Sequence, residues 1–189
     1  GIPLSEYSKE AIIKNISFVF QEAKLFKTSI YENVALAKKD ATYEEVMEAM
    51  RLAGCESIIE KFADAENTVI GSKGVYLSGG EKQRIAIARS ILKDSNIIIM
   101  DEASASIDPD NEYELQKAFK NLMKDKTVIM IAHRLSSISN VDEILVLEEG
   151  KIVERGTDKD LMSKDSRYKE LQEMYSIANE WRVGYEVVL

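Results

Sequence analysis

Two adjacent glycines begin a stretch of sequence that otherwise favours an α-helix. Residues 82–93 place apolar side chains at helical spacing, with charged and amide side chains between them. Ser78 and Glu81 fit a capping box, which accounts for these two residues but not for Gly79 and Gly80 between them. Bare backbone N–H groups at the positive end of a helix dipole bind phosphate well. The stretch therefore fits either an ordinary capped helix or a phosphate site, and taken alone it does not separate the two.

Polar side chains that could take part in catalysis follow three short apolar runs that predict strands. They are Gln21 after residues 16–20, Asp101 and Glu102 after residues 97–100, and His133 after residues 127–131. Adjacent carboxylates suit a cation or a reacting water, although two acids in a solvated loop, a structural histidine and a loop glutamine are each common. In parallel sheets, ligands bind at the carboxyl ends of the strands. The position that these side chains share, each just beyond a strand, favours a common site.

The elements that would position these residues follow the order expected of an α/β domain. Beyond the three strands, we expect helices at residues 42–53, 56–62, 79–93, 111–124, 159–162 and 166–178, and a β-hairpin formed by residues 142–147 and 151–154. Continuous apolar runs predict strands that are buried on both faces of a mainly parallel sheet.

The composition excludes several classes of protein. The chain has 189 residues, of which 45% are hydrophobic and 31% charged, and this fits one globular domain. No apolar run approaches the roughly 18 residues of a membrane span, and no secretory signal is visible. A net charge of −8 argues against a nucleic-acid surface, and the single cysteine and single histidine argue against structural zinc. Because Cys55 has no partner for a disulfide, we expect a reducing, cytosolic environment.

Taken in order, these motifs resemble the ATP-binding cassette (ABC) family, in particular the nucleotide-binding domain of exporter-type transporters. The matching segments are the signature motif at residues 77–84 (Leu-Ser-Gly-Gly-Glu-Lys-Gln-Arg), the Walker B strand at 97–102, the D-loop at 104–108, the Q-loop at Gln21 with exporter-like residues 25–33, the switch histidine at His133, and the closing hairpin at 150–157. The resemblance covers residues 1–171. It implies a P-loop NTPase-like α/β fold, with a mainly parallel sheet and a helical signature subdomain at about residues 30–93.

The resemblance also implies a site for ATP and Mg²⁺. The implied catalytic residues are Glu102, which polarises the attacking water, His133, which contacts the γ-phosphate, and Gln21; the implied metal ligands are Asp101 and Gln21. The residues implied to contact nucleotide bound on an opposing subunit are Ser78, Gly79, Gly80 and Glu81 of the signature, and Ser106 and Asp108 of the D-loop. The implied partners are a second nucleotide-binding domain, identical or different, and the transmembrane domain of a transporter, with no nucleic acid. The expected location is the cytoplasmic face of the cell membrane.

The phosphate-binding loop of this family, G-x-x-x-x-G-K-[ST], is absent from the chain. Only Gly150 is followed by a lysine, and the next residue is Ile152, where the motif requires serine or threonine. The chain therefore resembles a domain truncated at its N-terminus, with residues 1–178 as the partial domain and residues 179–189 as a tail without a functional interpretation. Without the backbone nest and lysine of that loop, we expect the chain alone to bind ATP weakly or not at all and not to hydrolyse it. Loss of a central strand would leave unpaired strand edges, so self-association is a further hypothesis.

Two positions depart from the family pattern. Glu81 stands where glutamine is usual, and a carboxylate so near a bound polyphosphate weakens that site unless a cation intervenes. Ser72 stands where exporters usually carry an acid that contacts the transmembrane partner. This second departure leaves the coupling to a transmembrane domain open.

Three functional hypotheses remain from the sequence. The leading one is the ATPase domain, or a large fragment of it, of a membrane exporter. The second is a catalytically silent module that lends its signature helix to a partner holding an intact phosphate loop. The third is a member of the superfamily that acts on DNA or ribosomes, which the acidic net charge disfavours.

Overall fold

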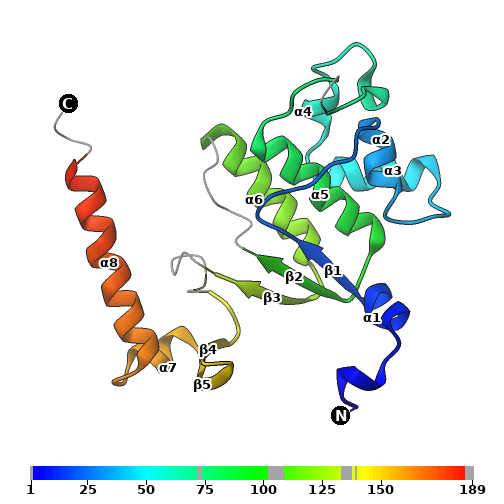
Figure 1. Ribbon diagram of the computed structural model, residues 1–189. Helices are drawn as coiled ribbons and strands as arrows, with labels where there is room; N and C mark the ends of the chain where they lie inside the picture. Colours follow the sequence, from blue (N-terminus) through cyan, green and yellow to red (C-terminus); the bar gives the residue numbers. More distant parts are fainter. Residues whose placement is uncertain (1, 72–73, 102–108, 133–137, 139, 186–189) are drawn as a thin grey trace. The chain divides into compact units, whose positions relative to one another are not determined.

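A computed structural model describes residues 2–71, 74–101, 109–132, 138 and 140–185 of the chain (Figure 1). The chain divides into two compact units, Gly1–Ile131 and Ala132–Leu189. The first unit contains a parallel sheet and the helices around it, and the second contains a β-hairpin and two helices. None of the helices in the described ranges is both long and apolar enough to cross a membrane.

Three parallel strands form the sheet of the first unit. They are β1 (Ile16–Val19), β2 (Ile97–Asp101) and β3 (Thr127–Ile131), in the order β1-β2-β3. In register, Val19 lies opposite Met100, and Asp101 lies opposite Ile131. All three predicted strands are therefore confirmed, and so is their parallel pairing. Because the strands are parallel, their carboxyl ends lie together at one end of the sheet, where ligands bind in sheets of this kind.

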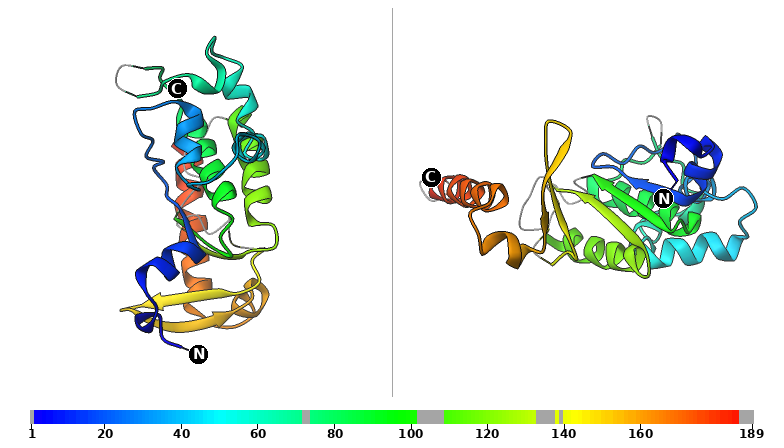
Figure 2. Two further views of the ribbon diagram at one scale, coloured as in Figure 1. Left: turned by 90° about the vertical axis from the view of Figure 1, so that its right-hand side faces the viewer. Right: turned by 90° about the horizontal axis from the view of Figure 1, so that it is seen from below.

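Helices cover one face of this sheet. The two long helices α5 (Gly79–Lys93) and α6 (Pro109–Met123) lie on the same side of the strands (Figure 2). Their apolar side chains form one core with residues of the strands, namely Val19, Ile98 and Met100. Both helices begin and end within two residues of the predicted bounds, because their apolar residues follow a clear helical period.

Within the described part of the first unit, the opposite face of the sheet is open, so the expectation of strands buried on both faces is wrong. Phe18 and Ile129 on this face are 49% and 51% exposed, and Phe20 and Ile131 are similarly exposed. The aromatic rings of Phe18 and Phe20 stack on each other with centroids 5.8 Å apart. The runs are apolar on both faces as predicted, but no described helix of the first unit covers the second face.

This open face, and the outer edges of β1 and β3, which pair with no other described strand, lead us to expect reversible self-association at high concentration. Light scattering of the purified chain should give a mass above that of the monomer, and Phe18→Ser combined with Ile129→Ser should lower it. A wild-type chain that stays monomeric up to its solubility limit would contradict this expectation.

A group of short helices lies beside α5. Helices α2 (Ile30–Ala35) and α3 (Tyr43–Leu52) pack against α5, and the 3-10 helix η2 (Ala65–Asn67) packs against α2. Helix α4 (Glu56–Ile59) is joined to α5 by a hydrogen bond from Arg84 to the hydroxyl of Ser57. The helix predicted at residues 56–62 is therefore only about half as long in the structure, and α2 was not predicted. Two further unpredicted elements, η1 (Leu4–Glu6) and α1 (Lys9–Asn15), precede the sheet.

Cys55 lies inside this helical group, fully buried at the start of α4. Burial raises the pKa of the Cys55 thiol to about 12, although the charge of Arg84 partly opposes this effect. We therefore expect the native chain at about pH 8 to react with a thiol reagent only as fast as this region opens. The colour developed with an aromatic disulfide reagent measures the reaction, and the chain in denaturant is the fast control. Rapid labelling of the native chain would show that the helical group is not packed around Cys55.

The second unit is built on a tight hairpin. Strands β4 (Ile144–Glu148) and β5 (Lys151–Gly156) pair in antiparallel fashion through a two-residue turn, in which Glu149 and Gly150 have φ values of 49° and 75°. Helices α7 (Asp158–Met162) and α8 (Arg167–Tyr185) follow. The predicted hairpin and both helices are confirmed, but α8 runs past residue 178, so the helix end predicted there is wrong. The reason is that neither proline nor glycine occurs in α8 before Gly184 to stop it.

Candidate functional site

The predicted capping box is present at the start of α5. The hydroxyl of Ser78 accepts a hydrogen bond from the backbone N–H of Glu81 at 3.2 Å, and the Glu81 carboxylate accepts one from the backbone N–H of Ser78 at 2.7 Å. These reciprocal bonds satisfy two donors of the first turn. The ordinary explanation of Ser78 and Glu81 is thus correct as far as it goes.

Gly79 is not explained by the cap. It lies exposed on the first turn of α5, and a Cβ atom added to it would meet no atom within 4 Å. The fold of this chain would therefore accept a side chain there without a clash. Since glycine lowers helix stability, its presence where the fold does not need it favours a requirement from outside the chain, such as a ligand close to the backbone.

The Glu81 carboxylate is buried and paired with a cation. Its side chain is 7% exposed, and its Oε1 lies 2.5 Å from Nζ of Lys61. Burial raises the pKa of Glu81, but the hydrogen bonds and charge of Lys61, together with the bonds to Ser78, outweigh it and leave the pKa lowered. A cation that compensates the charge of Glu81 is thus present, twenty residues upstream.

Helix α5 also contacts the segment just after β1, which carries Gln21. Nε2 of Gln83 donates a hydrogen bond of 3.0 Å to the carbonyl oxygen of Phe20, the residue before Gln21. The side chain of Gln83 is buried, whereas Gln21 is exposed. The signature helix and the Q-loop segment are therefore held together by a direct contact. We did not predict this role of Gln83, although the residue lies within the signature motif.

Asp101 ends strand β2, Gln21 comes two residues after strand β1, and these neighbouring strands end at the same end of the sheet. Asp101 is the last residue of β2 and is partly buried, on the same face as Phe18 and Ile129 by the alternation of the strands. Carboxylate and amide oxygens suit Mg²⁺, which keeps several waters when few protein ligands are available. No group of three or more histidine, cysteine or acidic residues that could hold a metal occurs among the residues that the structure describes.

The remaining predicted site residues lie outside the described ranges. They are Glu102, Ser106, Asp108 and His133, together with Ser72 of the second departure from the family pattern. Their predicted roles stay predictions. The structure does describe the residues from which two of these segments begin, Asp101 and Ala132.

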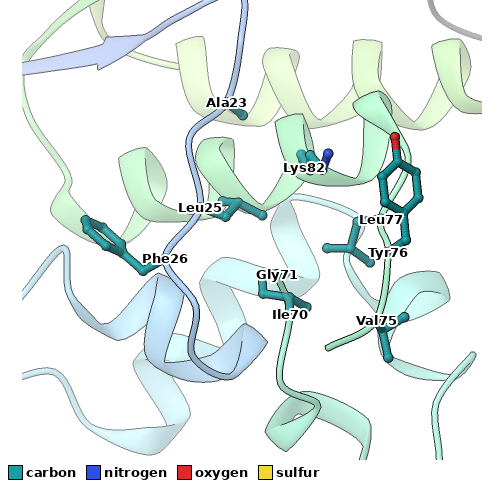
Figure 3. A pocket seen from close by; sticks show the side chains of 9 residues that line it. All are labelled: Ala23, Leu25, Phe26, Ile70, Gly71, Val75, Tyr76, Leu77 and Lys82. Carbon is teal, nitrogen blue, oxygen red and sulfur yellow. The ribbon is translucent and has the colours of Figure 1, made fainter. Parts of the chain in front are cut away.

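A mainly apolar hollow lies beside the Q-loop segment and the signature (Figure 3). Its volume is about 380 Å³, and it is lined by Ala23, Leu25, Phe26, Ile70, Gly71, Val75, Tyr76, Leu77 and Lys82. Tyr76 is 86% exposed, and Nζ of Lys82 lies 4.7 Å from the centre of its ring. The hollow thus connects the residues just after Gln21 with the residues just before Ser78, and an apolar side chain from another polypeptide would fit it.

The fold is an α/β domain with an open helix start beside a parallel sheet. The family model described as ABC transporter matches residues 1–105, more than half of the chain, so the chain belongs to the ABC transporter family. This finding confirms the family resemblance and the fold class expected from the sequence.

Similar proteins include a flippase and exporters. The ATP-dependent lipid A-core flippase of Legionella pneumophila (strain Paris) is 40% identical over 189 residues, which cover 100% of this chain and 32% of that protein. The Beta-(1-->2)glucan export ATP-binding/permease protein NdvA of Bartonella henselae is 39% identical over 178 residues, or 94% of this chain and 30% of that protein. A solved structure of a bacterial Atm1-family ABC exporter with ATP bound matches with a TM-score of 0.80 and 33% identity, over 90% of this chain and 30% of the other.

The chain spans about a third of the length of these curated relatives. These similarities confirm that it is ATP-binding-domain sequence of the exporter type, and they favour this interpretation over a silent interaction module.

Proposed function

We propose that the chain supplies the signature, Q-loop and Walker B residues of an ATPase that energises export across a membrane. The observation that carries this proposal is the open start of α5, where Ser78 caps the helix and Gly79 leaves room for a phosphate group. The γ-phosphate at this helix start belongs to ATP held by the phosphate loop of an opposing subunit. Two such domains then enclose nucleotide between them.

In the proposed reaction, the transfer of a phosphoryl group from ATP to water, each site residue of the chain has a separate role. Asp101 and Gln21 supply oxygen ligands for Mg²⁺, which neutralises charge on the phosphate oxygens when bound. Glu102 polarises the attacking water, and His133 contacts the γ-phosphate. Most of the rate enhancement comes from positioning and charge neutralisation, because this reaction requires little covalent chemistry of the protein.

The apolar hollow beside the Q-loop gives the transmembrane partner a place to dock. Its lining joins Leu25 and Phe26, which follow Gln21, to Leu77, which precedes Ser78. A segment of a transmembrane domain seated there touches both the Q-loop side and the signature side of the nucleotide site. The working location of the chain is then the cytoplasmic face of a membrane.

ATP-driven dimerisation tests the proposal. The chain is joined at its N-terminus to a segment that carries a phosphate loop, and Glu102→Gln is introduced to slow hydrolysis. Analytical ultracentrifugation should show a dimer only with ATP, and Ser78→Arg should prevent it while nucleotide binding by each monomer persists. A dimer that forms equally well with Ser78→Arg would refute the role of the signature.

A further inference from the structure

An ion pair joins the loop after α4 to the first turn of α5. Nζ of Lys61 lies 2.5 Å from Oε1 of Glu81, with the lysine side chain 55% exposed and the glutamate side chain 7% exposed. The second carboxylate oxygen, Oε2, accepts the backbone N–H of Ser78 at 2.7 Å. Both carboxylate oxygens of Glu81 thus have partners within the chain, one at Lys61 and one at Ser78.

The position of this carboxylate matters because it lies at the helix start where phosphate is expected. A buried carboxylate without a counter-charge is costly, and its negative charge would repel an approaching anion. Lys61 supplies that counter-charge from a separate segment. A glutamine at position 81 could form the same cap without needing any lysine.

We propose that Lys61 is a positioning residue for nucleotide binding, which neutralises Glu81 and holds it in the cap so that the start of α5 accepts phosphate. This inference rests on the proposed function, in which that helix start receives phosphate. Lys61 and Glu81 then act as one unit. Either single substitution, K61M or E81Q, changes the charge of this unit by one, whereas the double substitution K61M/E81Q leaves the unit neutral, as it is in the native chain.

The protonation of Glu81 reports on this contact. Burial alone would raise its pKa, whereas Lys61 and the Ser78 backbone and hydroxyl lower the pKa below its ordinary value. The stability that ionised Glu81 contributes is therefore complete above the ordinary carboxyl pKa, and it is lost as the pH falls through the lowered value. Without Lys61, its hydrogen bond and charge no longer lower the pKa of Glu81, so Glu81 takes up its proton at a higher pH.

The experiment uses the chain joined at its N-terminus to a phosphate-loop segment and carrying Glu102→Gln. It follows the amide NMR signals of Gly79 and Gly80 in this protein and in four variants of it: K61M, E81Q, K61M/E81Q and the conservative K61R. Each protein is titrated first with acid and then with MgATP. K61M should raise the pH at which the Glu81-linked shift occurs. It should also weaken the affinity for MgATP by about threefold to tenfold. K61R and K61M/E81Q should bind about as tightly as the wild type, and E81Q should lose the pH-dependent shift.

A matched control separates this role from general stabilisation. Lys38 pairs with Glu45 at 2.6 Å, and Glu45 caps α3 through Thr42 in the same geometry, but at a different helix start. Lys38→Met should therefore leave MgATP binding unchanged, even if it lowers the melting temperature as much as K61M does.

Three results would overturn the inference, and they differ from one another. Equal titration of the Gly79 and Gly80 signals in the wild type and K61M would show that Lys61 does not control Glu81. A shifted titration with unchanged MgATP affinity would show that the pair only stabilises the fold. If the Gly79 and Gly80 signals respond to MgATP in none of these joined proteins, the unsubstituted one included, the proposed phosphate site itself would be refuted, and the inference would fall with it.

Discussion

Gly79→Glu is expected to leave the chain folded, with a slightly raised melting temperature, while it abolishes ATP-driven dimerisation and lowers ATP hydrolysis by roughly a hundredfold or more. The new side chain enters open space, because no atom lies within 4 Å of the added Cβ. The substitution removes a glycine from the helix and adds a carboxylate near the positive end of the helix dipole. Each of these changes stabilises α5 by up to about 1 kcal/mol. The same carboxylate would occupy the site of the incoming phosphate and repel its negative charge.

Opposite changes in stability and activity make this result hard to explain by misfolding. Thermal unfolding is measured on the chain itself, and hydrolysis on the chain joined to a phosphate-loop segment. Gly79→Ala is the control for helix stabilisation without added charge, and it should keep more activity than Gly79→Glu. A Gly79→Glu protein that hydrolyses ATP at the normal rate would show that the open helix start does not contact nucleotide.

Asn33→Ala is expected to lower the free energy of unfolding by about 2–4 kcal/mol, since it leaves buried partners unsatisfied. The Asn33 side chain is fully buried on α2. Its Oδ1 accepts the backbone N–H of Phe26 at 2.8 Å and a hydrogen bond from Arg89, and its Nδ2 donates to the carbonyl oxygens of Phe26 and Ser29 at 3.0 and 2.9 Å. Alanine makes none of these bonds.

Denaturant unfolding followed by circular dichroism measures this change. Asn15→Ala is a matched control, because the Asn15 side chain is exposed and donates a single hydrogen bond to the carbonyl oxygen of Ala11. It should cost less than about 1 kcal/mol. Equal effects of the two substitutions would mean that the Asn33 network does not hold the segment after the Q-loop to α5.

The sheet and the long helices could be predicted because their signals are local. The apolar runs ending at Met100 and Ile131 are short, which indicates strands, and the segments beside them have a clear helical period. Strands that alternate with helices in this way predict a parallel sheet. The placement of Gln21 and Asp101 at one end of the sheet follows from that order. The position of the signature helix likewise follows from its own capping sequence at Ser78.

What could not be predicted depends on contacts between distant segments. Lys61 has no local signal that marks it as the partner of Glu81, because only the folded helical group brings the two together. The apolar strands gave no indication that Phe18 and Ile129 would lie on an open face, since apolar residues of a covered and an uncovered face look alike in sequence. Helix α2 is only six residues long and so has little periodicity to detect.

The hydrolysis of MgATP by the chain alone, compared with the chain joined to a phosphate-loop segment, tests the central claim most directly. The account predicts no sustained turnover by the chain alone, and turnover by the joined protein that Glu102→Gln removes. Sustained hydrolysis by the chain alone that Glu102→Gln abolishes would contradict it, because the signature and Walker B residues would then suffice without any phosphate loop.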